Sequence, residues 1–236
     1  MDGLVPGNRR REAAFQLGVI LAIKVALRAV LSWKPAQAVL PALPVVERSW
    51  VWFLFALGLL WWVRRWHRAE AGEFGLRPFR PWWRLLLIAL LGAIVAVVLG
   101  SLISPLTAAY FGKPELHRFS GIAHNLPLYL FLVPFAFVFA GFGEEFADRG
   151  VIMTRLALLF GSGKASWTAA LIVQAILFGL DHFYQGTAGM VDVGIYGLVY
   201  GAIFLVARRN LWANALSHGL LDALAFTLLY LGVMKF

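Results

Sequence analysis

Long apolar runs dominate this chain and restrict what it can fold into. They fall at roughly 13–31, 49–63, 82–104, 124–143 (continuing to 160), 165–183, 189–207 and 210–233. A helix needs about 20 residues to cross the hydrocarbon core of a bilayer. The pattern therefore predicts an all-α, polytopic membrane bundle of about seven transmembrane helices.

The composition excludes an ordinary soluble domain. Hydrophobic residues make up 61% of the 236 residues and charged residues 14%, against about 25% charged residues in a soluble domain. Cysteine is absent, which excludes disulfides, thiolate metal ligands and a cysteine nucleophile. The polar connections at 64–81 and 105–123 are too short to be domains. We expect one integral membrane domain over 1–236, with N-terminal helices of unknown role in 1–120 and catalytic core helices in 124–233.

The net charge of +9 does not indicate nucleic-acid binding, because the basic residues lie mostly at the ends of the apolar runs. Lys and Arg gather in alternate connections, which predicts a cytoplasmic N-terminus by the positive-inside rule. The Arg and Trp residues of 64–81 suit contact with anionic membrane lipids. Lys24 and Arg28 lie within the first run, so this segment either spans or lies along the interface as a basic amphipathic helix. No small-residue cleavage site follows it, so we expect it to remain as a helix.

Three clusters of ionisable residues interrupt the later apolar runs and are the best guide to function. A charge in hydrocarbon costs at least ~2.5–3.5 kcal/mol, so such residues are functional candidates by default. In the first cluster, Glu145 and Arg149 are four residues apart and are expected to form an ion pair on one helix face. Glu144 projects about 100° away and, without that partner, can serve as a general base. The structural alternative is an ion pair that only pins helices together, which would not need a second carboxylate.

The other two clusters each contain a histidine. Phe178 and His182 share a helix face, so the aromatic ring can wall a site in which the imidazole binds a water or the carboxylate. A histidine near a helix end can equally be a satisfied interfacial residue. His218, Asp222 and Asn214 share a face of the last run. The acid there can fix the imidazole tautomer, or both groups can donate to an oxyanion if the acid is protonated. An interhelical polar contact is the structural alternative.

These residues resemble the motifs of a known family, the type II CAAX prenyl protease-like membrane proteins, also called the CPBP or Abi family. The motifs of that family are Glu-Glu-x-x-x-Arg, Phe-x-x-x-His and His-x-x-x-Asn/Asp on successive core helices. All three occur in order within about the last 100 residues of this chain, as Glu144-Glu145 to Arg149, Phe178 to His182, and His218 to Asp222.

The resemblance implies an intramembrane endopeptidase of the glutamate type that needs no cofactor. Glu144 with His182 would activate a water for attack on the scissile carbonyl. His218 with Asp222 would stabilise the tetrahedral oxyanion. The Glu145–Arg149 pair would hold the base in place. The candidate catalytic residues are thus Glu144, His182, His218, Asp222, Glu145 and Arg149, and the candidate pocket residues are Phe178 and Asn214.

One position departs from the family pattern. Asp222 stands where the prenyl-protein processing enzymes have Asn, and an ionised Asp would oppose an oxyanion. The resemblance therefore favours a bacterial-type member of a prokaryotic cytoplasmic membrane, whose partners are membrane lipids and a different peptide or protein substrate, lipid-modified or not. The oligomeric state stays open.

Other classes of mechanism and function also remain open. Glu144, His182 and His218 could bind zinc with a water as the fourth ligand, although no His-Glu-x-x-His run is present. A non-catalytic membrane scaffold or immunity-type protein would keep the motifs without activity. A small proton-coupled transporter would also bury Glu, Asp and His, but the sequence shows no internal repeats of the transporter kind.

The expected topology places the two histidines at different depths in the membrane. With seven spans, His182 and His218 would differ in depth across the bilayer by about 10 Å or more, unless the helices tilt or break.

Overall fold

The computed structural model of the protein describes residues 7–32, 46–66 and 70–234. Every regular element in these residues is helical, which confirms the predicted all-α class. The longer elements are α1 (Gly7–Ser32), α3 (Val46–Trp66), α4 (Trp82–Phe111), α5 (Leu126–Phe135), α6 (Thr154–Phe160), α7 (Lys164–Asp181), α8 (Gly186–Val206) and α9 (Leu211–Tyr230). Two π-helical stretches are η3 (Ala136–Glu144) and η4 (Phe146–Met153), and three short 3-10 turns are η1 (Ala71–Phe74), η2 (His117–Ile122) and η5 (Phe183–Gln185).

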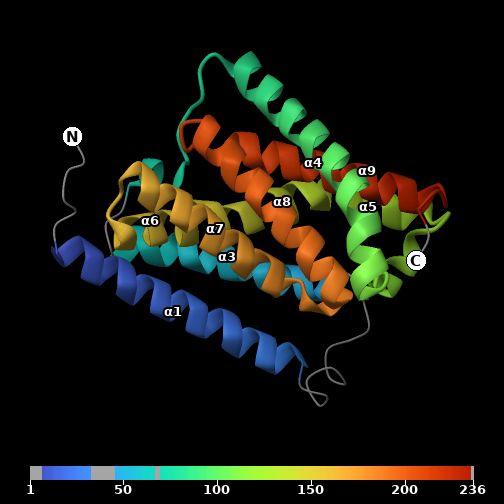
Figure 1. The fold of residues 1–236 in the computed structure, drawn as a ribbon, viewed down its shortest axis with the longest axis horizontal. Coiled ribbons are helices and arrows are strands. Elements are labelled where there is room, and N and C mark those ends of the chain that lie inside the picture. The colour runs from blue at the N-terminus through green and yellow to red at the C-terminus, as the bar shows by residue number, and fades with distance from the viewer. Residues whose placement is uncertain (1–6, 33–45, 67–69, 235–236) are drawn as a thin grey trace.

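The helices form a bundle with α1 along one edge and α4 along the other (Figure 1). The elements α5, η3, η4 and α6 follow one another without a break, so Leu126–Phe160 is one continuous helix. This helix packs against α9 and α3, while α8 packs against α7 and α4. The functional residues predicted from the sequence all lie on this helix and on α7 and α9, or directly after α7.

Four helices of the described part are long and apolar enough to cross a membrane: Gly7–Val30, Trp82–Phe111, Leu126–Phe160 and Phe183–Val206. A helical membrane protein is therefore the right class, but the expected seven spans are too many for these residues. The shortfall has a physical reason, because α7 and α9 carry buried polar side chains and α3 is bordered by charges. The prediction of a cytoplasmic N-terminus rests partly on Lys34, Arg68 and Lys235, which lie outside the described residues.

The predicted connection at 105–123 begins too early, because α4 continues through Pro105 to Phe111. A proline removes one backbone hydrogen bond from a helix. Membrane helices tolerate such a loss where neighbouring helices pack against them. Next to the proline, Thr107 donates its hydroxyl to the buried Asp192 carboxylate of α8 at 2.6 Å. This contact holds the continuing part of α4 against the bundle.

Glycines allow the helices that carry the predicted site to approach closely. A Cβ on Gly141 would lie 2.4 Å from the Ala215 carbonyl oxygen of α9. A Cβ on Gly179 of α7 would lie 2.5 Å from the Met190 carbonyl oxygen of α8. Both obstacles are backbone atoms, which cannot move aside as a flexible side chain can. Small residues at helix interfaces are typical of membrane bundles, since they let backbones come together.

We expect Gly141→Ala to destabilise the bundle by about 1–3 kcal/mol or more, because the added methyl group overpacks the contact with α9. The change should appear as a lower unfolding temperature of the purified protein in detergent. Gly18→Ala is the matched control, because a Cβ on Gly18 of α1 would meet nothing within 4 Å. Equal unfolding temperatures for the two variants would show that the close approach at Gly141 is not needed.

Candidate active site

The two adjacent glutamates lie at the junction of η3 and η4 and differ in burial. Glu145 is fully buried, whereas Glu144 is half-buried and lines a cavity. The stretch around them is π-helical, and such segments occur frequently at functional sites. The expectation that neighbouring carboxylates project in different directions is therefore met in this structure.

Glu145 accepts hydrogen bonds from three side chains, and this cluster joins two helices. Arg149 Nη1 donates to Oε1 at 2.9 Å, which confirms the predicted ion pair. From α9, Asn214 Nδ2 donates to Oε2 at 3.1 Å, and His218 Nδ1 lies 2.9 Å from Oε1. Arg149 is also fully buried and donates from Nη2 to the Gly197 carbonyl of α8 at 3.3 Å. The cluster fixes the orientation of the His218 ring.

His182 directly follows the last residue of α7 and is oriented by its own helix. Its Nδ1 lies 2.9 Å from the Phe178 carbonyl oxygen. A carbonyl only accepts, so Nδ1 carries the proton in this contact. In the neutral ring, Nε2 is then left with a lone pair that can accept a hydrogen bond from a water.

Aromatic rings bring the two histidines to one place. The Phe178 ring lies 4.9 Å from the His182 ring and 6.2 Å from the His218 ring, centroid to centroid. Tyr200 of α8 stacks on His218 at 4.7 Å with an interplanar angle of 18°. The Arg149 guanidinium lies 4.2 Å from the centre of the Phe178 ring. The depth difference expected between the two histidines therefore does not keep them apart.

A cavity of about 590 Å³ connects these groups. Glu144, His182, His218 and Asp222 all line it. Within the described residues, the Glu144 carboxylate has no hydrogen bond or ion pair. The rest of the wall is largely apolar and includes Phe135, Ala140, Phe226, Leu228 and Leu229. The cavity thus offers an open carboxylate and two imidazoles at the side of an apolar space.

Two side chains of α9, Asp222 and Asn214, lie differently from the sequence expectation. Asp222 Oδ1 is 3.8 Å from His218 Nε2, which is too long for a hydrogen bond. The acid that orients the His218 ring is therefore Glu145, reached across helices. Asn214 was a candidate pocket residue, but it is fully buried and does not line the cavity. It binds Glu145 and also donates to the Tyr200 carbonyl at 2.5 Å.

The sequence reasoning missed the N-terminal contribution to the cavity. Lys24 and Arg28 of α1 line it together with Asp148 and Asp181, and α4 also supplies part of the wall. The cavity is therefore not enclosed by residues 124–233 alone, because α1 and α4 supply part of its wall. The available signal was the four-residue spacing of two cations inside an apolar run.

Metal ligation was the open alternative for this site. In the described part of the chain, no group of three or more His, Asp and Glu side chains is arranged to hold a metal ion. Of the suggested zinc ligands, His218 uses Nδ1 for Glu145, while Glu144 and the Nε2 atom of His182 are open to the cavity. An activity measurement with and without a chelator therefore tests whether the site uses a metal ion.

Comparison with known proteins agrees with the motif analysis. Residues 126–224 match the family model described as type II CAAX prenyl endopeptidase Rce1-like. The match runs from the start of α5 into α9 and contains all three motifs, while α1, α3 and α4 lie outside it. It confirms the family resemblance and supports a membrane peptidase of the CAAX protease type. No curated protein and no solved structure matches the chain.

The different environments of the two glutamates predict effects of different size on stability. Glu145→Ala should lower the free energy of unfolding by ~3–5 kcal/mol, because it leaves the buried Arg149 without a counterion. Glu144→Ala should change it by less than ~1 kcal/mol, because no partner is lost. Unfolding curves of both variants in the same detergent provide the comparison. A larger loss for Glu144→Ala than for Glu145→Ala would contradict this account of the site.

Proposed function

We propose that this protein, whose core helices match the Rce1-like endopeptidase family, is an intramembrane glutamate endopeptidase. It hydrolyses a peptide bond of a membrane-associated or lipid-linked peptide with a water activated by Glu144 and His182. One observation carries the proposal: Glu144 lines the cavity without a hydrogen-bonding partner in the described structure, and the same cavity is lined by His182, whose Nδ1 is held by the Phe178 carbonyl. A carboxylate and an imidazole that share a cavity can together hold and deprotonate a water.

In the proposed mechanism, Glu144 takes a proton from the water while His182 Nε2 accepts its second hydrogen in a hydrogen bond. The water oxygen attacks the scissile carbonyl carbon and forms a tetrahedral intermediate with a negative oxygen. Glu144 then passes its proton to the leaving amine as the C–N bond breaks. The products are a carboxylic acid and an amine, so every proton is accounted for and no other reactant is needed.

His218 and Asp222 are proposed to stabilise the oxyanion. With Nδ1 held by Glu145, His218 can donate from Nε2 only when both ring nitrogens carry protons. Carboxylates face both of these nitrogens, at 2.9 Å for Glu145 and 3.8 Å for Asp222. An imidazolium in this position places a charged donor on the developing negative oxygen, where such donors contribute most. In this proposal, Glu145 and Arg149 orient His218; they do not hold the general base Glu144 in place.

The cavity wall favours an apolar substrate segment. Phe135, Phe226 and Leu229 line the space next to the charged groups. A peptide with large apolar side chains, or one linked to a lipid tail, can bury these groups against the wall. We propose access between helices from the membrane, in a prokaryotic cytoplasmic membrane with the N-terminus inside. Anionic lipids are proposed partners of the basic segment at 64–81.

The endopeptidase is tested by cleavage of a library of membrane peptides with purified protein in detergent. We expect cleavage by the wild type, loss of at least ~10²-fold in kcat for Glu144→Gln, and no effect of a strong chelator. Glu70→Gln is the control, because Glu70 is an exposed carboxylate remote in sequence from the motifs. Loss of activity on chelation with recovery on adding zinc would replace the glutamate mechanism by a metal mechanism.

Two further measurements, a cellular phenotype and proton uptake in vesicles, separate the other classes of function. A scaffold or immunity-type protein would keep its cellular phenotype in Glu144→Gln. A proton-coupled transporter would show substrate-dependent proton uptake in vesicles and no cleaved product. Cleavage that persists unchanged in Glu144→Gln would overturn the assignment of the general base.

The role of Asp222 yields a separate prediction. An amide donates a hydrogen bond at any pH, whereas a carboxyl group donates only when it is protonated. If Asp222 contributes to the oxyanion site, Asp222→Asn should be at least as active as the wild type, with the largest advantage at alkaline pH. The pH profile of kcat/KM for both proteins is the measurement. A loss of more than ~10-fold at every pH would instead indicate that the negative charge of Asp222 supports His218.

A further inference from the structure

The first helix brings two cations to the wall of the active-site cavity. Lys24 and Arg28 lie one turn apart on α1, and both line the cavity. Lys24 is 6% exposed, so its ammonium group is inside the protein and not at a membrane surface. A charge in such a place needs counterions, and the structure supplies two aspartates from other helices.

Lys24 joins the two helices that carry the proposed base and its histidine. Its Nζ lies 3.2 Å from Asp148 Oδ1 and also forms an ion pair with the Asp181 carboxylate. Asp148 is four residues after Glu144, and Asp181 directly precedes His182. One ammonium group thus binds one residue near each member of the pair.

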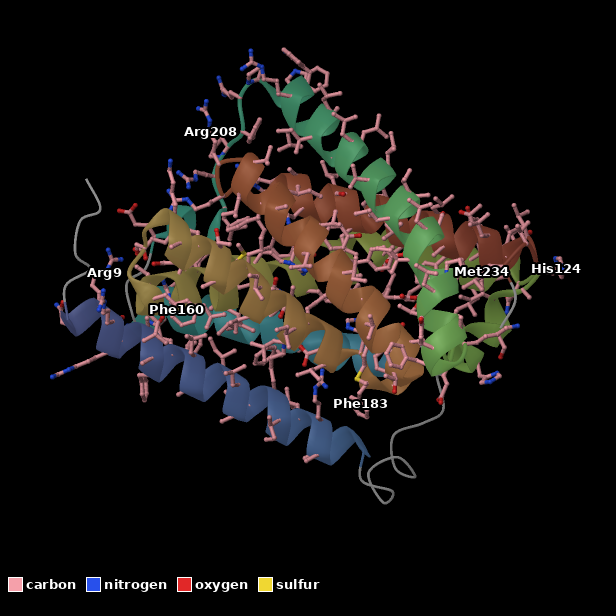
Figure 2. The ribbon with its side chains drawn as sticks, viewed as in Figure 1. Arg9, His124, Phe160, Phe183, Arg208 and Met234 are labelled. Atoms are coloured by element: carbon pink, nitrogen blue, oxygen red, sulfur yellow. The ribbon has the colours of Figure 1, made fainter. Side chains whose placement is uncertain are left out.

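Arg28 holds the end of α7 from the same side. Its guanidinium donates to the carbonyl oxygens of Leu180 at 3.1 Å and Asp181 at 2.8 Å, and it pairs with the Asp181 carboxylate. These carbonyls belong to the last turn of α7, where a helix has no internal donors left and a cation is favourable. The guanidinium also lies 5.5 Å from the centre of the Phe183 ring, at the end of the bundle labelled in Figure 2. His182 stands between these two anchored positions.

We propose that Lys24 and Arg28 are positioning residues of the active site, with Lys24 setting the separation of Glu144 and His182 and Arg28 fixing the turn that presents His182. This inference rests on the proposed function. It gives α1, which lies outside the family match, a defined role in catalysis. It also gives a role to the two charges that lie within the first apolar run.

A purely structural role would give a different result. If the ion pairs only attached α1, their loss would lower stability and leave the folded fraction fully active. A positioning role predicts that the folded protein binds substrate normally but reacts slowly, because misplacement of catalytic groups by about 1 Å costs about 10²-fold in rate. The ratio of the effects on kcat and KM therefore distinguishes the two.

We expect Lys24→Met to lower kcat by about 10²-fold and to change KM by less than about 3-fold. Lys24→Arg should restore kcat to within about 10-fold of wild type, because a guanidinium can bridge two carboxylates. Asp181→Asn, which removes one side of the bridge and leaves Asp148 paired, serves as a milder variant if Lys24→Met does not fold. Arg9→Met is the matched control, because Arg9 lies on the same helix and makes an exposed ion pair with Glu73.

A distance measurement tests the same inference without activity. The chain has no cysteine, so Val138→Cys and Leu180→Cys create unique sites for spin labels on two exposed positions of η3 and α7. Pulsed electron–electron double resonance measures the distance between the two labels. We expect one narrow distance distribution in the otherwise wild-type and Arg9→Met proteins, and a shifted or broadened distribution in Lys24→Met. An unchanged distribution in Lys24→Met, or an unchanged kcat, overturns the positioning role.

The two proposals fail in different ways. If the wild type cleaves, Glu144→Gln does not, and Lys24→Met is as active as the wild type, only the positioning role is wrong. If Glu144→Gln cleaves normally, the proposed mechanism is wrong. In that case, a changed label distance in Lys24→Met would still show that the ion pairs of Lys24 with Asp148 and Asp181 set the separation of the two helices.

Discussion

The buried carboxylate of Glu145 is the interaction on which the rest of the site depends. An ionised carboxylate without partners is very costly in a protein interior. Glu145 is fully buried and meets this cost with Arg149 on its own helix and with Asn214 and His218 on α9. These contacts require α9 to lie directly against the helix of the glutamates, which Gly141 permits. The position of His218 is therefore a consequence of how Glu145 is satisfied.

The hydrogen bonds to Glu145 also leave the Glu144 carboxylate available for other interactions. Arg149, Asn214 and His218 bind Glu145, whereas Glu144 lines the cavity and has no hydrogen bond or ion pair in the described part of the protein. Two neighbouring residues of one type thereby differ in chemistry, because one is fixed as an acceptor and the other is open to water and substrate. This division of roles is what a general base beside a structural carboxylate requires.

Much of the site could be predicted from the sequence because its motifs are local. The pair Glu145–Arg149 and the shared face of Phe178 and His182 depend only on helix periodicity, and both contacts are present. The orienting acid of His218 could not be found in this way, because i, i+4 spacing favours Asp222 whereas the true partner comes from another helix. Contacts between helices depend on packing, which the sequence pattern does not specify.

The number of membrane spans was mispredicted for a related reason. α7 and α9 carry polar residues that belong to the proposed site or its surroundings, and these residues lower the apolar content of the helices that need them. Lys24 and Arg28 left the first run open between a span and an interfacial helix, but they are paired with Asp148 and Asp181 inside the bundle, and the helix is long and apolar enough to span. Hydropathy treats each charge as exposed to lipid, whereas these charges face one another or a cavity.

The grouping of charges around one cavity has a consequence for hydrolysis in a membrane. Water is stable in a protein interior where several polar groups can bind it, and apolar cavities stay dry. Glu144, His182, Asp222 and the Lys24–Asp148–Asp181 cluster give this cavity such groups, while its remaining wall is apolar. A proposed hydrolase needs both properties in one space, a polar side that retains its reactant water and an apolar side that accepts the substrate. In the proposed hydrolase, the ion pairs of α1 would therefore have two roles, because the charges that hold the helices together are also polar groups that can bind water in the cavity.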